Sequence, residues 1–254
     1  MGKNKLRKFE EMETFPNVFQ FPFSQLQETG FEMKGKWNES CFGNNNPIVL
    51  ELGCGKGEYT VSLGKMFPSK NFIGIDIKGA RIWTGAKQAI ADKMQNVAFL
   101  RTHIELIDRF FAQHEIAEIW ITFPDPQAQK RNKRLTSSRF LSLYSKILRQ
   151  QGIIHLKTDS NFLYTYTCGI VQENHLPIRM QTTDLYRTHP TDEVLAIRTF
   201  YEQQWLERGL SIKYLQFVCE PRAQYLEPDM EIEPDGYRST CRRKNNIINN
   251  ERLV

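Results

Sequence analysis

The sequence predicts a single α/β domain with a mostly parallel sheet, helices on both faces and a late antiparallel strand. Three observations lead to this fold class. From Pro47 onward, short apolar runs alternate with longer segments of helical pattern, which is typical of parallel strands joined by helices. A glycine-rich turn follows the first apolar run, where such sheets bind ligands. A length of 254 residues suits one large domain.

Each element follows from a local pattern. Short runs rich in β-branched and aromatic residues predict strands at Ile48–Leu52, Phe72–Ile77, Val97–Arg101, Ile116–Phe123, Ile153–Lys157 and, late in the chain, Ile212–Val218. The segments between them predict helices at Glu58–Phe67 and Ala80–Met94, from about Ile104, Thr136 and Asn161, and at Glu193–Arg208, which Gly209 closes.

The first 45 residues differ from the rest. They begin with a basic cluster, continue with the aromatic and proline-rich FPNVFQFPF, and end near the linker Gly43–Asn46. This composition predicts an N-terminal arm over residues 1–45, partly disordered until a partner binds it. Residues 46–254 form the predicted catalytic domain.

Composition limits the classes of function. The net charge of +5 and the isoelectric point near 8.9 suit a nucleic-acid partner. The five cysteines form no C-x-x-C pair, and no apolar stretch is long enough for a membrane helix. We therefore expect a cytoplasmic protein with free thiols and no membrane contact. His103 and His155 lack a second ligand at metal spacing, so no metal site is expected.

The glycine loop ELGCGKGE follows the first predicted strand. Gly53 and Gly55 allow a sharp turn and a close approach of a ligand to the main chain. Asp76 ends the next strand about twenty residues later, where a carboxylate can bind ribose hydroxyls; a helix cap is the alternative. The carboxylates of Glu51 and Glu58 would repel a pyrophosphate, so the loop favours S-adenosylmethionine over a dinucleotide.

The segment FPDPQAQKRNKR places a carboxylate and four cations close together. Asp125 lies beyond the carboxyl end of the strand Ile116–Phe123, between two prolines that stiffen its loop. The cations that follow are Lys130, Arg131, Lys133 and Arg134. Such a run is either a solvated surface or a contact for a polyanion.

With ELGCGKGEY, FIGIDI, FPDP and its basic run, LKTD and TFYE in this order, the chain resembles the bacterial tRNA (guanine-N7)-methyltransferases over nearly its whole length. The resemblance implies a Rossmann-like class I fold. It also implies an enzyme that methylates N7 of a guanine in the variable loop of tRNA, with S-adenosylmethionine as cofactor.

The resemblance also implies roles for individual positions. The residues implied to bind the cofactor are Glu51, Gly53, Gly55, Asp76, His103 and Asp125, and Asp125 is implied to be catalytic as well. The residues implied to bind the guanine are Gln129, Asp159, Thr199 and Glu202. The residues implied to contact tRNA are Lys130, Arg131, Lys133 and Arg134. Three positions depart from the family: His103 replaces an acid, Gln127 a tryptophan and Gln129 a lysine. The basic run is also shorter than usual.

The chemistry of guanine N7 matches these residues. N7 has an in-plane lone pair and no proton, so methyl transfer requires positioning and no general base. Positive charge moves from sulfur to the purine, and the carboxylate of Asp125 can stabilise it. Asp159 or Glu202 can accept hydrogen bonds from guanine N1–H and N2–H₂, which adenine does not offer as a pair.

Two other functions are compatible with the sequence. One is a cofactor-binding RNA chaperone or regulator that has lost its activity. The departures from the family at His103 and Gln129 are consistent with such a loss. The other is a nicotinamide-dependent oxidoreductase, which the glycine loop alone supports. Asp159 also suits a cap of the helix that follows it, a role compatible with substrate contact, and the three-residue spacing of Thr199 and Glu202 also suits an ordinary amphipathic helix surface. The expected partner is tRNA, bound by a monomer or a homodimer.

Overall fold

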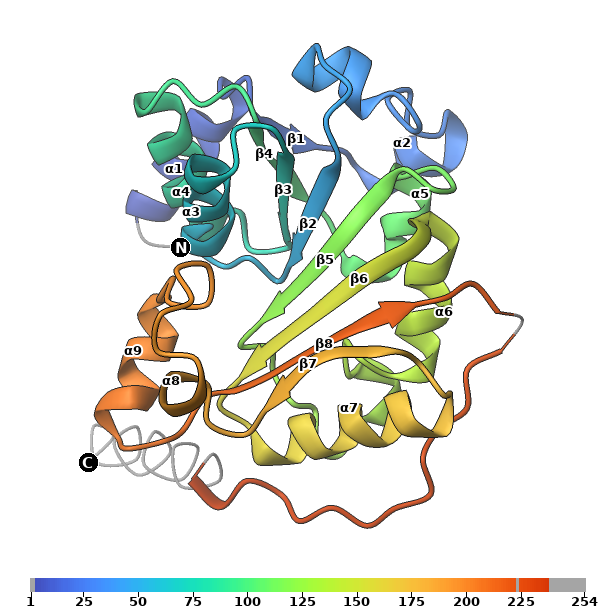
Figure 1. The fold of residues 1–254 in the computed structure, drawn as a ribbon. Coiled ribbons are helices and arrows are strands. Elements are labelled where there is room, and N and C mark those ends of the chain that lie inside the picture. Colours follow the sequence, from blue (N-terminus) through green and yellow to red (C-terminus); the bar gives the residue numbers. More distant parts are fainter. Residues whose placement is uncertain (1–2, 223, 238–254) are drawn as a thin grey trace, which may run out of the picture.

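The computed structural model describes residues 3–222 and 224–237. Its strands are β1 (Val18–Gln20), β2 (Ile48–Leu52), β3 (Asn71–Asp76), β4 (Val97–Arg101), β5 (Ile116–Thr122), β6 (Leu148–Thr158), β7 (Ile178–Thr182) and β8 (Lys213–Cys219). They form one sheet in the order β1-β4-β3-β2-β5-β6-β8-β7 (Figure 1). Neighbours from β1 to β6 are parallel, whereas β8 is antiparallel to β6 and β7. The predicted fold class is confirmed.

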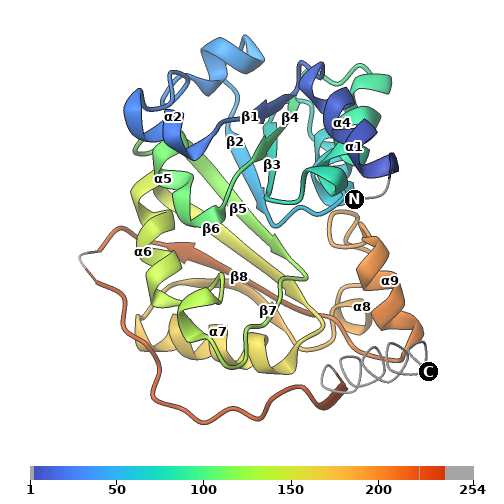
Figure 2. The same cartoon turned by 180° about the vertical axis from the view of Figure 1, so that it is seen from behind.

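The α-helices lie on both faces of this sheet. They are α1 (Lys3–Glu13), α2 (Phe23–Glu28), α3 (Glu58–Met66), α4 (Gly79–Ala91), α5 (Ile107–Phe110), α6 (Ser138–Ile147), α7 (Asn161–Glu173), α8 (Leu185–Thr188) and α9 (Phe200–Glu207). A π-helical turn spans Asn38–Phe42, and 3₁₀ turns span Ile104–Leu106 and Arg131–Lys133. Helices α3 and α4 cover one face with α1, whereas α5, α6 and α7 cover the other (Figures 1 and 2).

Alternate strand residues divide the core between the two faces. In β2, Leu50 packs with the cluster under α5, α6 and α7, whereas Val49 packs with the cluster under α3 and α4. Ile73 and Phe72 of β3 divide in the same way. Because successive side chains of a strand point to opposite faces, a run that is apolar at every position requires a cover on both sides. The continuous apolar runs in the sequence are therefore the direct cause of the three layers.

Residues of the N-terminal arm join the sheet and its core. Strand β1 pairs in parallel with β4, with Val18 opposite Phe99. The fully buried Trp37 donates its indole N–H to the Phe110 carbonyl at 3.0 Å and stacks on Phe111. The pairing and the buried rings show how the described part of the arm packs; the domain boundary at residue 45 stays a prediction.

The predicted late helix is shorter than expected. The prediction placed it at Glu193–Arg208, whereas α9 begins at Phe200. The hydroxyl of Thr199 accepts from the Glu202 backbone N–H, and the Glu202 carboxylate accepts from the Thr199 N–H. This reciprocal cap fixes the start of the helix. Gly209, with φ +74°, follows its end as predicted.

Strand β2 carries an acidic side chain inside the core. Glu51 of β2 is 3% exposed, and its carboxylate accepts hydrogen bonds from Thr60 of α3 and from Thr122 of β5, the latter at 2.7 Å. Burial raises the pKa of Glu51 to about 7, although these hydrogen bonds act against the shift. The carboxyl group thus links β2, α3 and β5. Its burial costs more free energy when the group is ionised than when it is neutral.

Among the helices of the described residues, none is long and apolar enough to cross a membrane.

Replacing Gly85 by Ala should destabilise the protein. A Cβ at this position would lie 2.6 Å from the Lys56 carbonyl oxygen and 2.8 Å from the Phe99 ring, so α4 would have to move away from the glycine loop. We expect a loss of about 1 to 3 kcal/mol in the free energy of urea unfolding. The exposed neighbour Thr84, changed to Ala, should shift it by no more than about 0.5 kcal/mol. Equal stability of G85A and wild type would contradict this packing.

The buried Glu51 predicts a pH dependence. Its folded pKa lies above the unfolded value of 4.5, so its contribution is present below pH 4.5 and is lost as the pH rises through about 7. Relative to E51Q, which does not titrate, the unfolding free energy of the wild type should fall by roughly 2.5 kcal/mol between pH 5 and pH 8. Parallel pH profiles of the two proteins in urea unfolding would refute this.

Candidate functional site

The predicted site residues follow the carboxyl ends of adjacent parallel strands. Leu52, at the end of β2, pairs with Ile75 of β3 on one side and with Ile121 of β5 on the other. The chain runs from β2 outward through β3 to β4 and then crosses back to β5 on the other side of β2, so the order in which strands are added reverses between β2 and β5. Open α/β sheets bind ligands at such a point. The glycine loop and the Asp125 loop leave the sheet side by side here.

The glycine loop turns back over the end of β3. The N–H groups of Gly53 and Cys54 donate to the Ile75 carbonyl at 2.8 and 3.0 Å. Gly53, Gly55 and Gly57 have φ of +74°, +57° and +73°, a region that other residues rarely adopt. A Cβ on Gly53 would meet no atom within 4 Å, so its open side can receive a ligand.

Asp76 holds this loop from the neighbouring strand. One carboxylate oxygen accepts from the Gly55 N–H at 3.0 Å and the other from the Lys78 N–H at 2.8 Å. Each carboxylate oxygen has two lone pairs, so both retain an acceptor position. The predicted pair of glycine loop and Asp76 is therefore in direct contact. Glu51 lies behind the loop, bonded to Thr60 and Thr122.

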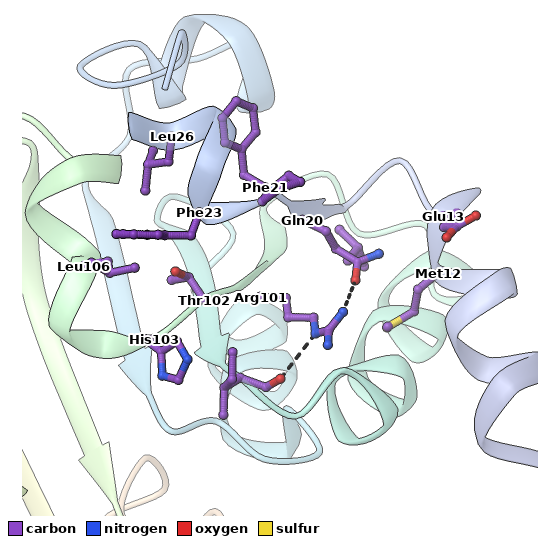
Figure 3. Close-up of a pocket in the computed structure, with 13 residues that line it drawn as sticks. Met12, Glu13, Gln20, Phe21, Phe23, Leu26, Arg101, Thr102, His103 and Leu106 are labelled. Carbon is purple, nitrogen blue, oxygen red and sulfur yellow. Dashed lines mark hydrogen bonds between the residues drawn. The ribbon is translucent and has the colours of Figure 1, made fainter. Parts of the chain in front are cut away.

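A cavity of about 540 Å³ lies between the ends of β3 and β4 and the N-terminal arm (Figure 3). Ile77 and His103 line it from the sheet, and Phe21 and Phe23 line it from the arm. Arg101 joins the two walls, donating to the Ile77 carbonyl at 3.2 Å and to the Gln20 side chain at 3.0 Å. The exposed His103 thus borders a space large enough for a small ligand.

The Asp125 loop has a strained backbone. Phe123 and Gln127 have φ of +48° and +49°, which is unusual for residues with large side chains. The Phe123 N–H donates to the Lys157 carbonyl at 2.8 Å, and the exposed Asp125 carboxylate accepts from the Gln127 N–H at 3.1 Å. Strain of this kind persists where the surroundings fix it, and it is common at functional sites.

The four cations of the basic run have different surroundings. Arg134 is 8% exposed, lies over the rings of Phe162 and Tyr166, and donates to the carbonyls of Gln127 and Ala128 at 3.3 and 2.8 Å. Arg134 therefore stabilises the Asp125 loop through these two carbonyls. The other members, Lys130, Arg131 and Lys133, are exposed, as is Gln129.

Two of the exposed cations have acidic neighbours. Lys133 lies 2.9 Å from Glu105, and Arg131 lies 3.9 Å from Glu227. Pairs that are open to water on one side hold together weakly, so both cations can exchange these carboxylates for other anions.

Asp159 lies just beyond β6 and is almost fully buried. Its carboxylate accepts from the Tyr237 hydroxyl at 2.6 Å, and its carbonyl accepts from Lys213 at 3.0 Å. The helix α7 is capped by Ser160, whose hydroxyl accepts from the Leu163 N–H at 2.9 Å. The alternative that Asp159 serves as this cap is thus wrong.

Glu202, which caps α9 together with Thr199, contacts a buried cation that sequence reasoning missed. The ammonium of Lys157 lies 2.9 Å from the Glu202 carboxylate, and both side chains are fully buried. It also donates to the carbonyls of Leu195 and Ile197 at 2.7 and 2.9 Å. Burial lowers the pKa of Lys157, and the charge of Glu202 opposes that shift. Lys157 belongs to the LKTD segment, but its neighbours depend on the tertiary fold.

Residues 3–222 and 224–237 contain no group of three or more histidine, cysteine, aspartate or glutamate side chains that could hold a metal ion.

Comparison with known proteins agrees with this geometry. Residues 45–215 match a methyltransferase family, described as "Putative methyltransferase". A crystal structure of the 16S rRNA methyltransferase KamB is similar in fold, with a TM-score of 0.56 and 14% identity over 72% of this chain and 92% of that one. At this identity the likeness concerns the fold alone.

Curated relatives are much more similar in sequence. The tRNA (guanine-N(7)-)-methyltransferase of Bacteroides fragilis is 59% identical over 96% of this chain and 97% of its own length. The protein of the same name from Porphyromonas gingivalis is 64% identical over 92% of this chain and 97% of its own length. The chain belongs to the tRNA (guanine-N(7)-)-methyltransferase family.

Proposed function

We propose that this protein transfers the methyl group of S-adenosylmethionine to N7 of a guanine in the variable loop of tRNA. Membership of the family supports this function. The observation that carries it is the position of Asp125, in a strained loop that leaves the sheet next to the glycine turn. A group there can lie close to a bound cofactor and to an incoming base at once.

The residues around the glycine turn fit the proposed cofactor. Gly53 and Gly55 leave the main chain accessible, and Asp76 retains lone pairs for ribose hydroxyls. The cavity bordered by Ile77 and His103 has the size of a small-molecule site and suits the adenine ring. Bound S-adenosylmethionine supplies an electrophilic methyl group on a sulfonium centre. Glu51 lies behind the turn, and a carboxylate there disfavours a pyrophosphate.

Asp125 is the proposed catalytic residue. Guanine N7 requires no general base, so the residue acts through its charge. A carboxylate fixed beside the purine stabilises the positive charge that develops there, without reorganising during the reaction. The positive-φ backbone, the two prolines and Arg134 all keep the carboxylate in one position.

The guanine itself is proposed to enter beside β6. The Asp159 carboxylate can accept hydrogen bonds from N1–H and N2–H₂ of a base that takes the place of the Tyr237 hydroxyl, and the exposed Gln129 can contribute an amide. Glu202, which Lys157 of β6 holds, and Thr199, which caps α9 together with it, are proposed to border this region. An unpaired loop base reaches such a site at the lowest cost, because it has no partner to leave.

The direct test is incubation of the protein with unmodified tRNA and S-adenosylmethionine labelled in the methyl group. Label recovered in 7-methylguanine supports the proposal. Binding of S-adenosylmethionine and tRNA without transfer would favour the inactive RNA regulator. Tight binding of a nicotinamide cofactor instead of S-adenosylmethionine would favour the oxidoreductase.

Replacing Asp125 by Asn should slow the chemical step. The amide keeps the size of the side chain and removes its charge, so stabilisation of the developing cation is lost. We expect the rate constant of single-turnover transfer to fall by roughly 100-fold, a larger factor than any loss of affinity for S-adenosylmethionine. E39Q serves as the control, because Glu39 is exposed and far from Asp125 in the sequence. If D125N retains the wild-type rate constant, the catalytic assignment is wrong.

Replacing the three exposed cations of the basic run by Ala should weaken tRNA binding. A cation that neutralises a phosphate steepens the salt dependence of the binding constant, so the slope should fall by about two to three for the triple variant of Lys130, Arg131 and Lys133. R134K is the matched control: it keeps the charge but lacks the paired donors and the planar group over the rings. It should slow methyl transfer and leave the salt slope as it is. An unchanged slope in the triple variant would defeat the assignment.

A further inference from the structure

Two large aromatic side chains are exposed at the start of α9. Phe200 is 48% exposed and Tyr201 38%, and their rings meet edge to face at 5.7 Å. Neither ring is part of the proposed chemistry. Adjacent exposed rings of this size are a typical feature of a binding surface.

Each ring has a cation over it. The ammonium of Lys56 lies 4.0 Å from the centre of the Phe200 ring, and the guanidinium of Arg81 lies 5.5 Å from that of Tyr201. Lys56 belongs to the glycine loop and Arg81 to the first turn of α4. Within the part of the chain that the structure describes, neither cation lies within 4.0 Å of a carboxylate. Their charge is therefore available to an anionic partner.

The backbone that carries the two exposed rings is held on both sides. The Phe200 N–H donates to the Glu58 carboxylate at 3.3 Å, which ties the start of α9 to the start of α3. One residue after Tyr201, Glu202 is fixed by the buried Lys157. A surface that is already ordered loses little conformational entropy when a partner binds.

We propose that Phe200, Tyr201, Lys56 and Arg81, here called the aromatic platform, bind an unpaired nucleotide of the RNA substrate next to the target guanine. Proteins bind single-stranded RNA by stacking bases on aromatic rings while cations contact the phosphates, and the aromatic platform offers both groups together. The platform includes residues of the glycine loop and of α4, whereas the basic run leads into α6 on the other side of the sheet. In this proposal the two surfaces therefore contact the RNA on either side of the target. The inference rests on the proposed function and names the second contact that the RNA makes.

The test replaces both rings by Leu, which keeps an apolar side chain and removes the aromatic face. We expect F200L/Y201L to raise the dissociation constant of unmodified tRNA about tenfold, with the salt slope and the affinity for S-adenosylmethionine unchanged. K56Q/R81Q should instead make the slope shallower by about one to two. Affinity for tRNA equal to wild type in both variants would overturn the inference.

The matched control is F200W, which retains an aromatic face. It should bind tRNA within about twofold of wild type, and stacking should quench the fluorescence that the added indole contributes beyond the wild-type signal. Absence of that quenching, or an F200L/Y201L variant that loses affinity for S-adenosylmethionine to the same extent as for tRNA, would assign the rings to the cofactor site or to packing. Transfer of label to 7-methylguanine by the wild type tests the proposed function separately. If that succeeds while the Leu variants bind normally, only the platform is refuted.

Discussion

A single buried cation, Lys157, fixes the geometry on which the candidate site depends. Its carbonyl receives the Phe123 N–H at the start of the Asp125 loop, and its ammonium holds Glu202 and two carbonyls of the segment before α9. A cation without water around it requires these partners, because an unpaired buried charge costs several kcal/mol. The same residue thereby joins the end of β5, the end of β6 and the start of α9.

Order in the Asp125 loop follows from the same principle. The positive φ at Phe123 and Gln127 is unfavourable by itself, and the buried Arg134 offsets it by donating to the carbonyls of Gln127 and Ala128. A carboxylate that is fixed before the substrate arrives needs no reorganisation during methyl transfer. The buried cations Lys157 and Arg134 therefore position the loops of this site. The exposed cations, such as Lys130, remain accessible to an anionic polymer.

The features that could be predicted from the sequence are those that local residue patterns determine. The strands from Ile48 to Arg101 and the glycine loop with Asp76 were predicted because apolar periodicity and turn residues specify them. Strand β1 was missed because its three residues carry no strand pattern, and pairing with β4 stabilises it. The sequence could not show that Arg134 is buried while the other cations of the basic run are exposed. Its burial depends on the rings of Phe162 and Tyr166, which α7 brings against it.

The most direct test of the central claim is a crystal structure of the protein with S-adenosylhomocysteine and guanosine bound. The account predicts that the Asp125 carboxylate lies beside both the sulfur atom and the purine ring, with the loop from Phe123 to Gln127 unchanged. A carboxylate that faces away from the sulfur, with the purine held next to another loop, would contradict it.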